Sequence, residues 1–259
     1  MVWCGIDLGS RNVKVALLNN DGVRYYKFDT IKFYREHGRL VNGKLQVDLE
    51  SLLSVEEQID TVVSTGYGRQ TVNLAGARAI PEIKAHVLGA AYATGLTDFT
   101  LLDLGGQDSK VALVSGGRMV DFQTNDKCAA STGRYLENMA DVLGISTEEL
   151  SRYHENPVEL TSTCAIFGET ELIGRVVEGY STASLAAGVN YTIFKRIRPM
   201  LQKLLSPVIV FTGGVAANTA LRKIIRRELA VEVRVPPAPQ YAGALGCCLA
   251  ARREGENRG

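Results

Sequence analysis

Short apolar runs bounded by turn residues alternate along this chain with segments whose apolar residues recur at helical spacing. Short apolar runs of this kind are typical of buried strands. They predict strands at Val2–Leu8, Val13–Leu18, Val23–Phe28, Thr61–Ser64, Thr100–Leu104, Lys110–Val114, Met119–Gln123, Val208–Phe211 and Val231–Val235. The helical spacing predicts helices over 48–58, 81–94, 135–143, 165–176, 182–205, 216–229 and 241–253. Alternating strands and helices indicate an α/β fold with packed mixed sheets.

One strand–turn–strand segment occurs twice. Asp-Leu-Gly-Ser-Arg-Asn-Val-Lys-Val-Ala-Leu-Leu at 7–18 aligns with Asp-Leu-Gly-Gly-Gln-Asp-Ser-Lys-Val-Ala-Leu-Val at 103–114, an offset of 103 − 7 = 96 residues. Asp, Leu, Gly, Lys, Val, Ala and Leu match in register, and such a repeat indicates a duplicated architecture. We therefore expect a first half over 1–96, with the helix 241–254 packing on it, and a second half over 97–240.

Each copy of the repeat places an aspartate at the end of a strand, followed by small residues in a turn. Glycine lets backbone N–H groups approach a phosphate closely, and successive N–H groups there form an anion nest. A carboxylate at that place suits Mg²⁺, which needs oxygen ligands. A single copy is more often an ordinary hairpin turn, whereas two copies in register favour a polyphosphate site. Thr212–Val215 is a third glycine turn, between a buried strand and a helix start, and it also suits a nucleotide.

Two of the five cysteines, Cys128 and Cys164, stand beside Ser and Thr residues at predicted helix starts. The unpaired N–H groups and the helix dipole there lower the pKa of a thiol. A lone cysteine is most often an inert apolar residue, but two in this setting favour a bound anionic cluster. Cys4 lies inside a predicted strand, and Cys247 and Cys248 lie among Gly, Ala and Leu, so these three indicate core packing.

A [4Fe–4S] cluster normally needs four thiolates. With two candidate ligands in each chain, four are reached in a symmetric dimer with the cluster on its two-fold axis. Metal or redox use also fits the composition better than a disulfide framework, because five cysteines in 259 residues do not form one.

Charge and hydropathy exclude two classes of partner. The chain has 29 basic and 28 acidic residues, so its net charge of +1 gives no electrostatic footprint for nucleic acid. No apolar run approaches the ~20 residues that span a bilayer. The N-terminus enters a predicted strand directly, without a signal sequence. We expect a cytoplasmic protein that binds neither nucleic acid nor membrane.

Three glycine turns at strand ends in a duplicated architecture resemble the superfamily of actin, the Hsp70 chaperones and the sugar kinases. The resemblance implies α/β ribonuclease H-like domains, duplicated around a nucleotide cleft. It implies that seven residues handle the phosphates of ATP or ADP and Mg²⁺, namely Asp7, Gly9, Ser10, Asp103, Gly105, Gly106 and Asp108. It also implies that Gly213 and Gly214 line the adenosine, and it adds to the cofactor-binding set Arg11, Lys14, Gln107, Val215 and Gln240.

Pro81–His86 resembles the connecting helix whose acidic residue orients the attacking water in the chaperone branch. This resemblance makes Glu82 a catalytic candidate beside Asp7, Asp103 and Asp108. A solvated glutamate at a helix start is the alternative interpretation of Glu82.

A narrower resemblance rests on motifs that span residues 5–246. They are Asn125–Arg134, Ser162–Cys164, Asp103–Asp108, Thr212–Ala216 and Ala238–Gly246. Together they resemble the activator ATPases of 2-hydroxyacyl-CoA dehydratases and the ATP-binding subunits of benzoyl-CoA reductase, the BadF/BadG/BcrA/BcrD type. Ser131 stands where many members have glycine, a departure that leaves the cysteine pattern intact.

This family resemblance implies an ATPase coupled to electron transfer. One [4Fe–4S] cluster would lie between the two subunits of a homodimer, held by Cys128 and Cys164 of each. ATP hydrolysis would drive an electron to an iron–sulfur partner, a 2-hydroxyacyl-CoA dehydratase or a related reductase, with ferredoxin or flavodoxin as donor. Closure of the domains on the γ-phosphate would move the helices that follow the two cysteines.

The sequence is also compatible with two other functions. A small-molecule kinase of the same superfamily would carry no iron and would need a catalytic base, a role that Asp108 could fill. A nucleotide-sensing regulatory domain would bind MgATP and act on partners without hydrolysing it.

Overall fold

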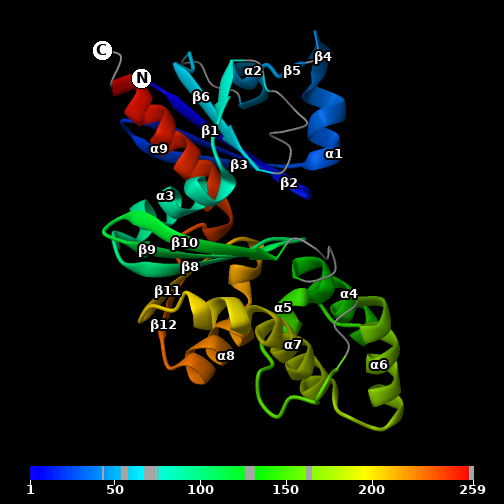
Figure 1. Cartoon of the computed structure of the whole chain (residues 1–259). Helices are drawn as coiled ribbons and strands as arrows, with labels where there is room; N and C mark the ends of the chain where they lie inside the picture. Colours follow the sequence, from blue (N-terminus) through cyan, green and yellow to red (C-terminus); the bar gives the residue numbers. More distant parts are fainter. Residues whose placement is uncertain are drawn as a thin grey trace. The chain divides into compact units, whose positions relative to one another are not determined.

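The computed structural model describes residues 1–42, 44–53, 58–66, 74, 76–125, 132–161 and 165–256. They form two compact units, which are described separately: unit 1 is Met1–Gly95 with Gln240–Gly259, and unit 2 is Leu96–Pro239 (Figure 1). Among the helices in these ranges, none combines the length and the apolar character needed to cross a bilayer.

Unit 1 is built on a five-stranded sheet in the order β3-β2-β1-β6-β7. Its antiparallel part comprises β1 (Trp3–Leu8), β2 (Asn12–Asn19) and β3 (Gly22–Asp29). On the other side of β1, β6 (Thr61–Thr65) runs parallel to β1, and β7 (Ala77–Ala79) runs parallel to β6. In the pairing of β1 with β2, Asp7 lies opposite Lys14. The two side chains therefore lie on the same face of the sheet, the carboxylate before the turn and the ammonium group after it.

The two faces of this sheet are covered by different segments because side chains alternate along each strand. Cys4, Ile6 and Leu8 pack into a cluster with Phe33 and Leu49. These last two come from η1 (Phe33–His37), which follows the short α1 (Thr30–Lys32), and from α2 (Leu49–Leu53). A small hairpin of β4 (Arg39–Val41) and β5 (Lys44–Gln46) connects them.

The opposite face of the unit 1 sheet carries α3 (Glu82–Thr94) and α9 (Ala242–Glu256, red in Figure 1). Trp3, Ala16 and Val63 of the strands pack there with Ala85 of α3 and with Ala244 and Leu245 of α9. Asp7 follows Trp3 at an even spacing along β1, so its side chain faces these two helices.

Unit 2 repeats the strand order with a second five-stranded sheet, β10-β9-β8-β11-β12. Its strands are β8 (Phe99–Leu104), β9 (Ser109–Ser115), β10 (Arg118–Asn125), β11 (Val208–Thr212) and β12 (Glu232–Arg234). In the pairing of β8 with β9, Asp103 lies opposite Lys110, as Asp7 lies opposite Lys14 in unit 1. The sequence repeat is therefore also a repeat of register.

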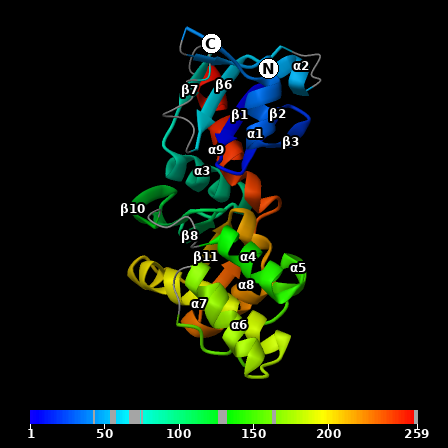
Figure 2. The ribbon, with the colours of Figure 1, turned by 90° about the vertical axis from the view of Figure 1, so that its right-hand side faces the viewer.

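One large hydrophobic core fills unit 2 between its sheet and its helices. Figure 2 shows these elements from another side. Leu102 and Leu104 of β8 and Phe211 of β11 point into it. The helices of this unit are α4 (Gly133–Leu143), α5 (Thr147–Leu150), α6 (Ala165–Val177), α7 (Thr182–Lys203), the 3₁₀ turn η3 (Gly214–Ala217) and α8 (Thr219–Leu229). The 3₁₀ turn η4 (Pro239–Tyr241) leads out of unit 2 toward α9.

Of the helix expected over 48–58, the described residues include α2, Leu49–Leu53, whereas residues 58–60 are not helical. Asp60 instead pairs with Val2: its N–H donates to the Val2 carbonyl at 2.9 Å, and its carboxylate accepts from the Val2 N–H at 2.6 Å. This pairing holds the segment directly before β6 beside the start of the chain, and the neighbouring Ile59 is buried.

The helix expected over 216–229 begins later, at Thr219. Residues 214–217 form a 3₁₀ turn, and the Asn218 side chain then accepts a hydrogen bond from the Leu221 N–H at 2.8 Å. Asparagine is a preferred N-cap, so this side chain starts a new helix rather than continuing one. The helix expected over 182–205 ends at Lys203 and contains Pro199.

Candidate nucleotide and metal site

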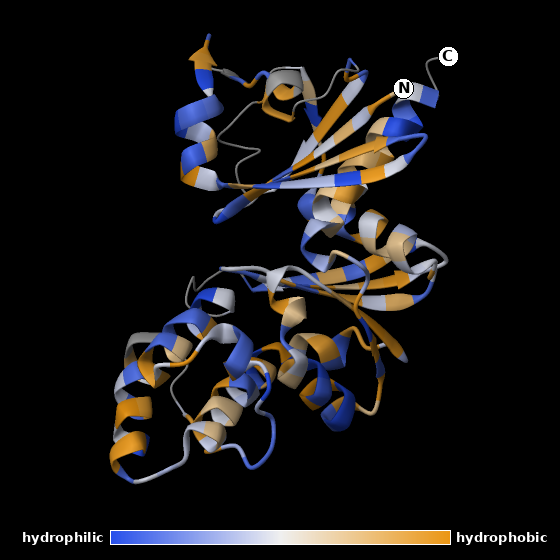
Figure 3. Ribbon diagram, turned by 180° about the vertical axis from the view of Figure 1, so that it is seen from behind, coloured by the Kyte–Doolittle hydropathy of each residue, from blue (hydrophilic) through white to orange (hydrophobic). Residues whose placement is uncertain are grey.

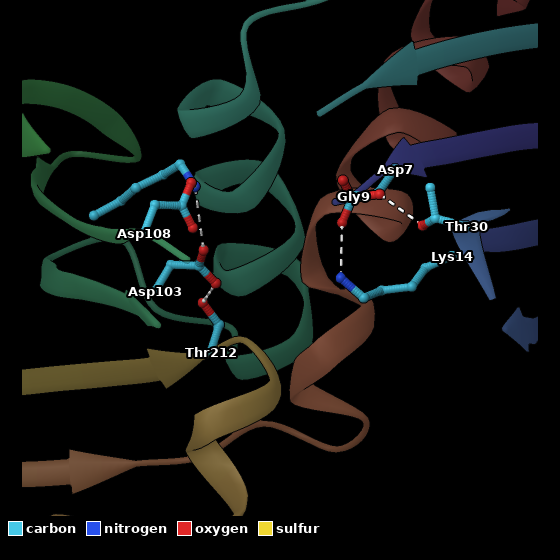
Figure 4. Close-up of polar contacts among 8 residues, drawn as sticks. Asp7, Gly9, Lys14, Thr30, Asp103, Asp108 and Thr212 are labelled. Atoms are coloured by element: carbon cyan, nitrogen blue, oxygen red, sulfur yellow. Dashed lines mark hydrogen bonds and ion pairs between the residues drawn. The ribbon is translucent and has the colours of Figure 1, made fainter. Parts of the chain in front are cut away.

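The carboxylate of Asp7 is the buried centre of the candidate site in unit 1. Only 2 % of Asp7 is exposed, and its Oδ2 accepts a hydrogen bond from Lys14 Nζ at 3.2 Å (Figure 4). Its Oδ1 is buried and has no hydrogen-bond partner within the described part of the chain. A buried carboxylate oxygen is costly unless something binds it, so Asp7 fits a role as a ligand.

Glycines make room for the Asp7 side chain. Gly66 has a φ of +99°, and a Cβ there would lie 2.8 Å from Asp7 Oδ1. A Cβ at Gly243, on α9, would lie 2.7 Å from His86 Nε2 and 3.2 Å from Asp7 Oδ2. Both positions therefore need glycine for the carboxylate to keep this place.

Glu82 and His86 extend the site from the first turns of α3. One ligand atom from each, together with one from Asp7, lie within 4.8 Å of one another. Residues four apart share a helix face, and His86 is 97 % buried on that face while Glu82 is partly exposed. This group could hold a cation. His86 is absent from the predicted set, although its four-residue spacing from Glu82 could have identified it.

The turn after β1 is held by the segment that follows β3. Thr30 Oγ1 donates to the Gly9 carbonyl at 2.8 Å, and the Thr30 N–H donates to the Arg11 carbonyl at 3.1 Å. Ser10 and Arg11 are exposed on this turn. The turn thus has a fixed backbone and accessible polar groups, as a phosphate-binding turn requires.

Asp103 is the corresponding carboxylate in unit 2, and it is also 2 % exposed. Thr212 Oγ1 donates to its Oδ1 at 2.8 Å, and Lys110 Nζ lies 3.9 Å from its Oδ2 (Figure 4). Lys110 also bonds to the Asp108 carboxylate, so one ammonium group lies between two carboxylates. Lys110 is a further residue absent from the predicted set, although it matches Lys14 in the repeat.

The glycine turns of unit 2 lie next to Asp103. The Gly105 N–H donates to the Asp108 carbonyl at 3.0 Å, and a Cβ at Gly105 would lie 2.6 Å from Asp108 Oδ1. Gly213 has a φ of +86° and would place a Cβ 2.3 Å from the Leu104 carbonyl oxygen. The structure therefore brings together the predicted unit 2 residues Asp103, Gly105, Gly106, Gln107, Asp108, Gly213, Gly214 and Val215. Gln240, at the start of the C-terminal segment of unit 1, is partly exposed.

The two predicted cluster ligands, Cys128 and Cys164, lie outside the described residues. Cys4, Cys247 and Cys248 are buried in unit 1, which confirms that they pack in its cores. Cys248 Sγ donates to the Ala16 carbonyl at 2.8 Å. Burial raises the pKa of both Cys247 and Cys248 well above the usual thiol value.

We expect Cys247 and Cys248 to resist alkylation in the folded, metal-free protein. The thiolate is the reactive form, and because burial raises both pKa values, neither thiol ionises appreciably at pH 8. Treatment with iodoacetamide followed by peptide mass mapping should label both only after unfolding in urea. Labelling of either cysteine in the native protein at the unfolded rate would contradict this expectation.

Comparison with known proteins identifies relatives of the whole chain. The sequence model of the "BadF/BadG/BcrA/BcrD ATPase family" matches residues 4–251. The (R)-2-hydroxyglutaryl-CoA dehydratase activating ATPase of Acidaminococcus fermentans is 34 % identical over 257 residues, which cover 96 % of this chain and 96 % of that protein.

Two solved structures extend the comparison to the fold. The activator of the 2-hydroxyisocaproyl-CoA dehydratase from Clostridium difficile, with bound ADPNP, superposes with a TM-score of 0.85 at 32 % identity, covering 100 % of this chain and 97 % of that one. MreB 5 of Spiroplasma citri superposes with a TM-score of 0.60 at 14 % identity, covering 99 % and 98 %, and supports the fold alone. The predicted actin-like α/β fold is confirmed. The chain belongs to the BadF/BadG/BcrA/BcrD ATPase family and is an ATP-hydrolysing enzyme.

Proposed function

We propose that this ATPase is the activator component of an iron–sulfur enzyme system, using ATP hydrolysis to deliver a low-potential electron. Its acceptor would be a 2-hydroxyacyl-CoA dehydratase or a related iron–sulfur reductase, and its donor ferredoxin or flavodoxin. The observation that carries the proposal is the division of the cysteines. Three are buried in the cores of an ATPase unit, which leaves Cys128 and Cys164 for chemistry.

Asp7 and Asp103 are the residues that would hold Mg²⁺, directly or through water. The Oδ1 of Asp7 is buried and has no partner among the residues that the structure describes, so it fits a hard cation, which prefers oxygen ligands. Mg²⁺ supplies charge neutralisation at the phosphates when it is bound. The chain's own groups would do the rest: the turns Gly9–Arg11 and Gly105–Gln107 bind phosphate oxygens, and Glu82 orients water. Gly213, Gly214, Val215 and Gln240 would bind the remainder of the nucleotide.

The lysines of the two repeats would orient the carboxylates and neutralise phosphate charge. Lys14 contacts Asp7, and Lys110 lies between Asp103 and Asp108. The contact with Lys110 favours a positioning role for Asp108 rather than the role of a kinase base, because the carboxylate is already bonded to this ammonium group. An alternative kinase activity would require Asp108 to take up a proton from a substrate hydroxyl.

The cysteine count also fits the stoichiometry of a shared cluster. Four thiolates at two per chain require two copies, so we propose a homodimer with one [4Fe–4S] cluster. The α6 helix begins at Ala165, the residue after Cys164, and exposes large apolar side chains. Phe167 is 69 % and Val177 is 83 % exposed, and Figure 3 shows hydrophobic residues on this helix. Exposed apolar surface of this kind supports contact with another protein.

Anaerobic purification followed by iron analysis and an absorption spectrum tests this proposal. We expect about two irons per chain, half of a four-iron cluster. Cys128→Ser and Cys164→Ser should each lose most of this iron, because each removes two of the four ligands in a dimer. Cys247→Ala, which changes a core cysteine, should retain it.

A full iron content in Cys128→Ser would contradict the ligand assignment. A colourless wild-type protein that releases ADP in the presence of a sugar would favour the kinase instead. A protein with the cluster that fails to pass electrons to its partner in the presence of MgATP would contradict the activator role.

A further inference from the structure

The start of α4 is bonded to the glycine turn that follows β8. The Gly133 N–H donates to the Gly105 carbonyl at 3.1 Å, and the Arg134 N–H donates to the Gly106 carbonyl at 3.0 Å. The first N–H groups of a helix have no partner within the helix and are usually satisfied by a capping side chain or water. At α4 the N-cap residue is Thr132, whose side chain makes no capping bond. The carbonyls of the glycine turn therefore cap this helix.

Glycine at position 133 permits this contact. A Cβ there would lie 3.0 Å from the Gly105 carbonyl oxygen, 3.2 Å from Gly106 Cα and 3.4 Å from Val215 Cγ2. Val215 belongs to η3, directly after the Gly213 turn. The first residue of α4 thus lies against both glycine turns of unit 2, so closely that a methyl group there requires its neighbours to shift.

The body of α4 packs in turn against α6. Tyr135 is fully buried, and a Cβ at Gly168 of α6 would lie 3.4 Å from its ring and 3.9 Å from Met139 Sδ. The guanidinium of Arg196, on α7, lies over the same ring at 4.2 Å. A shift at the start of α4 would therefore press on α6, because closely packed interiors transmit displacement.

We propose that Gly133 and the backbone N–H of Arg134 couple the Gly105–Gly106 turn to α4, and through Tyr135 to α6. This inference rests on the proposed function, in which that turn contacts the phosphates of the nucleotide. When the γ-phosphate is present, its contacts reposition the carbonyls of Gly105 and Gly106, and the two bonds carry the change to α4. Gly133 is a positioning residue here, and it acts through backbone contacts alone.

The coupling has a direct readout in hydrogen exchange of α4. Wild-type protein is compared in MgADP and in Mg-ADPNP, and peptides covering Gly133–Leu143 are analysed by mass spectrometry. We expect exchange in the first turn to differ about fivefold between the two nucleotides, the equilibrium factor for one net hydrogen bond. Equal exchange in both nucleotides would overturn the proposal. This measurement needs no cluster, so its result stands whether or not iron is bound.

A matched pair at position 134 isolates the backbone bond. Arg134→Pro removes the N–H, and proline is tolerated in the first turn of a helix. Arg134→Ala removes the exposed side chain and keeps the N–H. We expect Arg134→Ala to retain the nucleotide-dependent difference and Arg134→Pro to lose it. Retention of the full difference in Arg134→Pro would contradict the proposal.

Gly133→Ala provides a second, independent change. Its methyl group requires the Gly105 carbonyl to shift and so weakens the bond from the Gly133 N–H. We expect the difference between the nucleotides to fall by up to about fivefold, the factor for one hydrogen bond. Gly174→Ala on α6 is the control, because a Cβ there meets nothing within 4 Å. Nucleotide-dependent exchange in folded Gly133→Ala at the wild-type level would overturn the inference. A wild-type protein without iron that still shows this nucleotide-dependent exchange would count against the proposed cluster and not against the coupling.

Discussion

Asp7→Asn should lower kcat for Mg²⁺-dependent ATP hydrolysis by about 100-fold or more, since a bound metal contributes several kcal/mol and each 1.4 kcal/mol is a factor of ten. Asparagine keeps the shape of the side chain but removes the charge that binds the cation. The Oδ1 of Asp7 is buried without a hydrogen-bond partner among the described residues, so this oxygen is open to a cation while Oδ2 contacts Lys14. Steady-state phosphate release across a Mg²⁺ titration measures the effect.

Asp21→Asn is the matched control for this change. Asp21 lies at the turn between β2 and β3 of the same sheet and is exposed, so the same chemical change there should leave kcat within about twofold, as for an ordinary surface substitution. Circular dichroism would verify that both variants are folded. More than a tenth of the wild-type rate in Asp7→Asn would argue against a Mg²⁺-binding role for this carboxylate.

Gly246→Ala should destabilise unit 1 by about 3 kcal/mol or more, at the upper end of the cost of overpacking. A Cβ at Gly246 of α9 would lie 1.8 Å from the Ala85 carbonyl oxygen of α3. The obstructing atom belongs to the helix backbone, so no side chain can rotate away. A Cβ at Gly89 of α3 would meet the Ala242 carbonyl oxygen at 2.0 Å, so the close approach of the two helices depends on glycine from both.

Trp3 is a built-in probe for this measurement. It is the one tryptophan of the chain, and it packs in the core between the unit 1 sheet and α9. Urea unfolding followed by its fluorescence should show a lower midpoint for Gly246→Ala. Gly174→Ala, which adds the same methyl group to an open position on α6, should be neutral or stabilise its helix by about 0.5–1 kcal/mol. An unchanged Trp3 transition in Gly246→Ala would contradict the packing argument.

The glycines of α9 also connect stability with chemistry. Gly246 and Gly89 permit the contact of α9 with α3, and Gly243 leaves room for His86 and Asp7. A substitution at Gly243 would therefore disturb the candidate metal site directly, whereas one at Gly246 would act through the fold. Through Gly243, α9 thus reaches a site whose carboxylate comes from the N-terminal strand β1.

Local sequence determined most of the strands and the positions of the two corresponding carboxylates, Asp7 and Asp103. Side chains alternate between the two faces of a strand, so each aspartate lies on one face of its own sheet and the apolar residues directly before and after it lie on the other. The repeat at an offset of 96 residues also carried the register, because Asp7 opposite Lys14 and Asp103 opposite Lys110 are the same pairing. The family could be predicted for the same reason, since its motifs are short and contiguous.

Only the tertiary structure decided which distant residues meet. His86 joins Asp7 because α3 packs on the sheet face that carries this carboxylate. Lys110 lies between two carboxylates because β9 returns beside β8. The capping of α4 by the Gly105–Gly106 turn likewise joins residues that are 28 positions apart (133 − 105). Such contacts depend on how elements pack, and packing is set by the complementarity of whole surfaces. Local periodicity does not contain that information. The pattern of apolar residues followed by turn residues was enough, however, to place each carboxylate at the end of its strand.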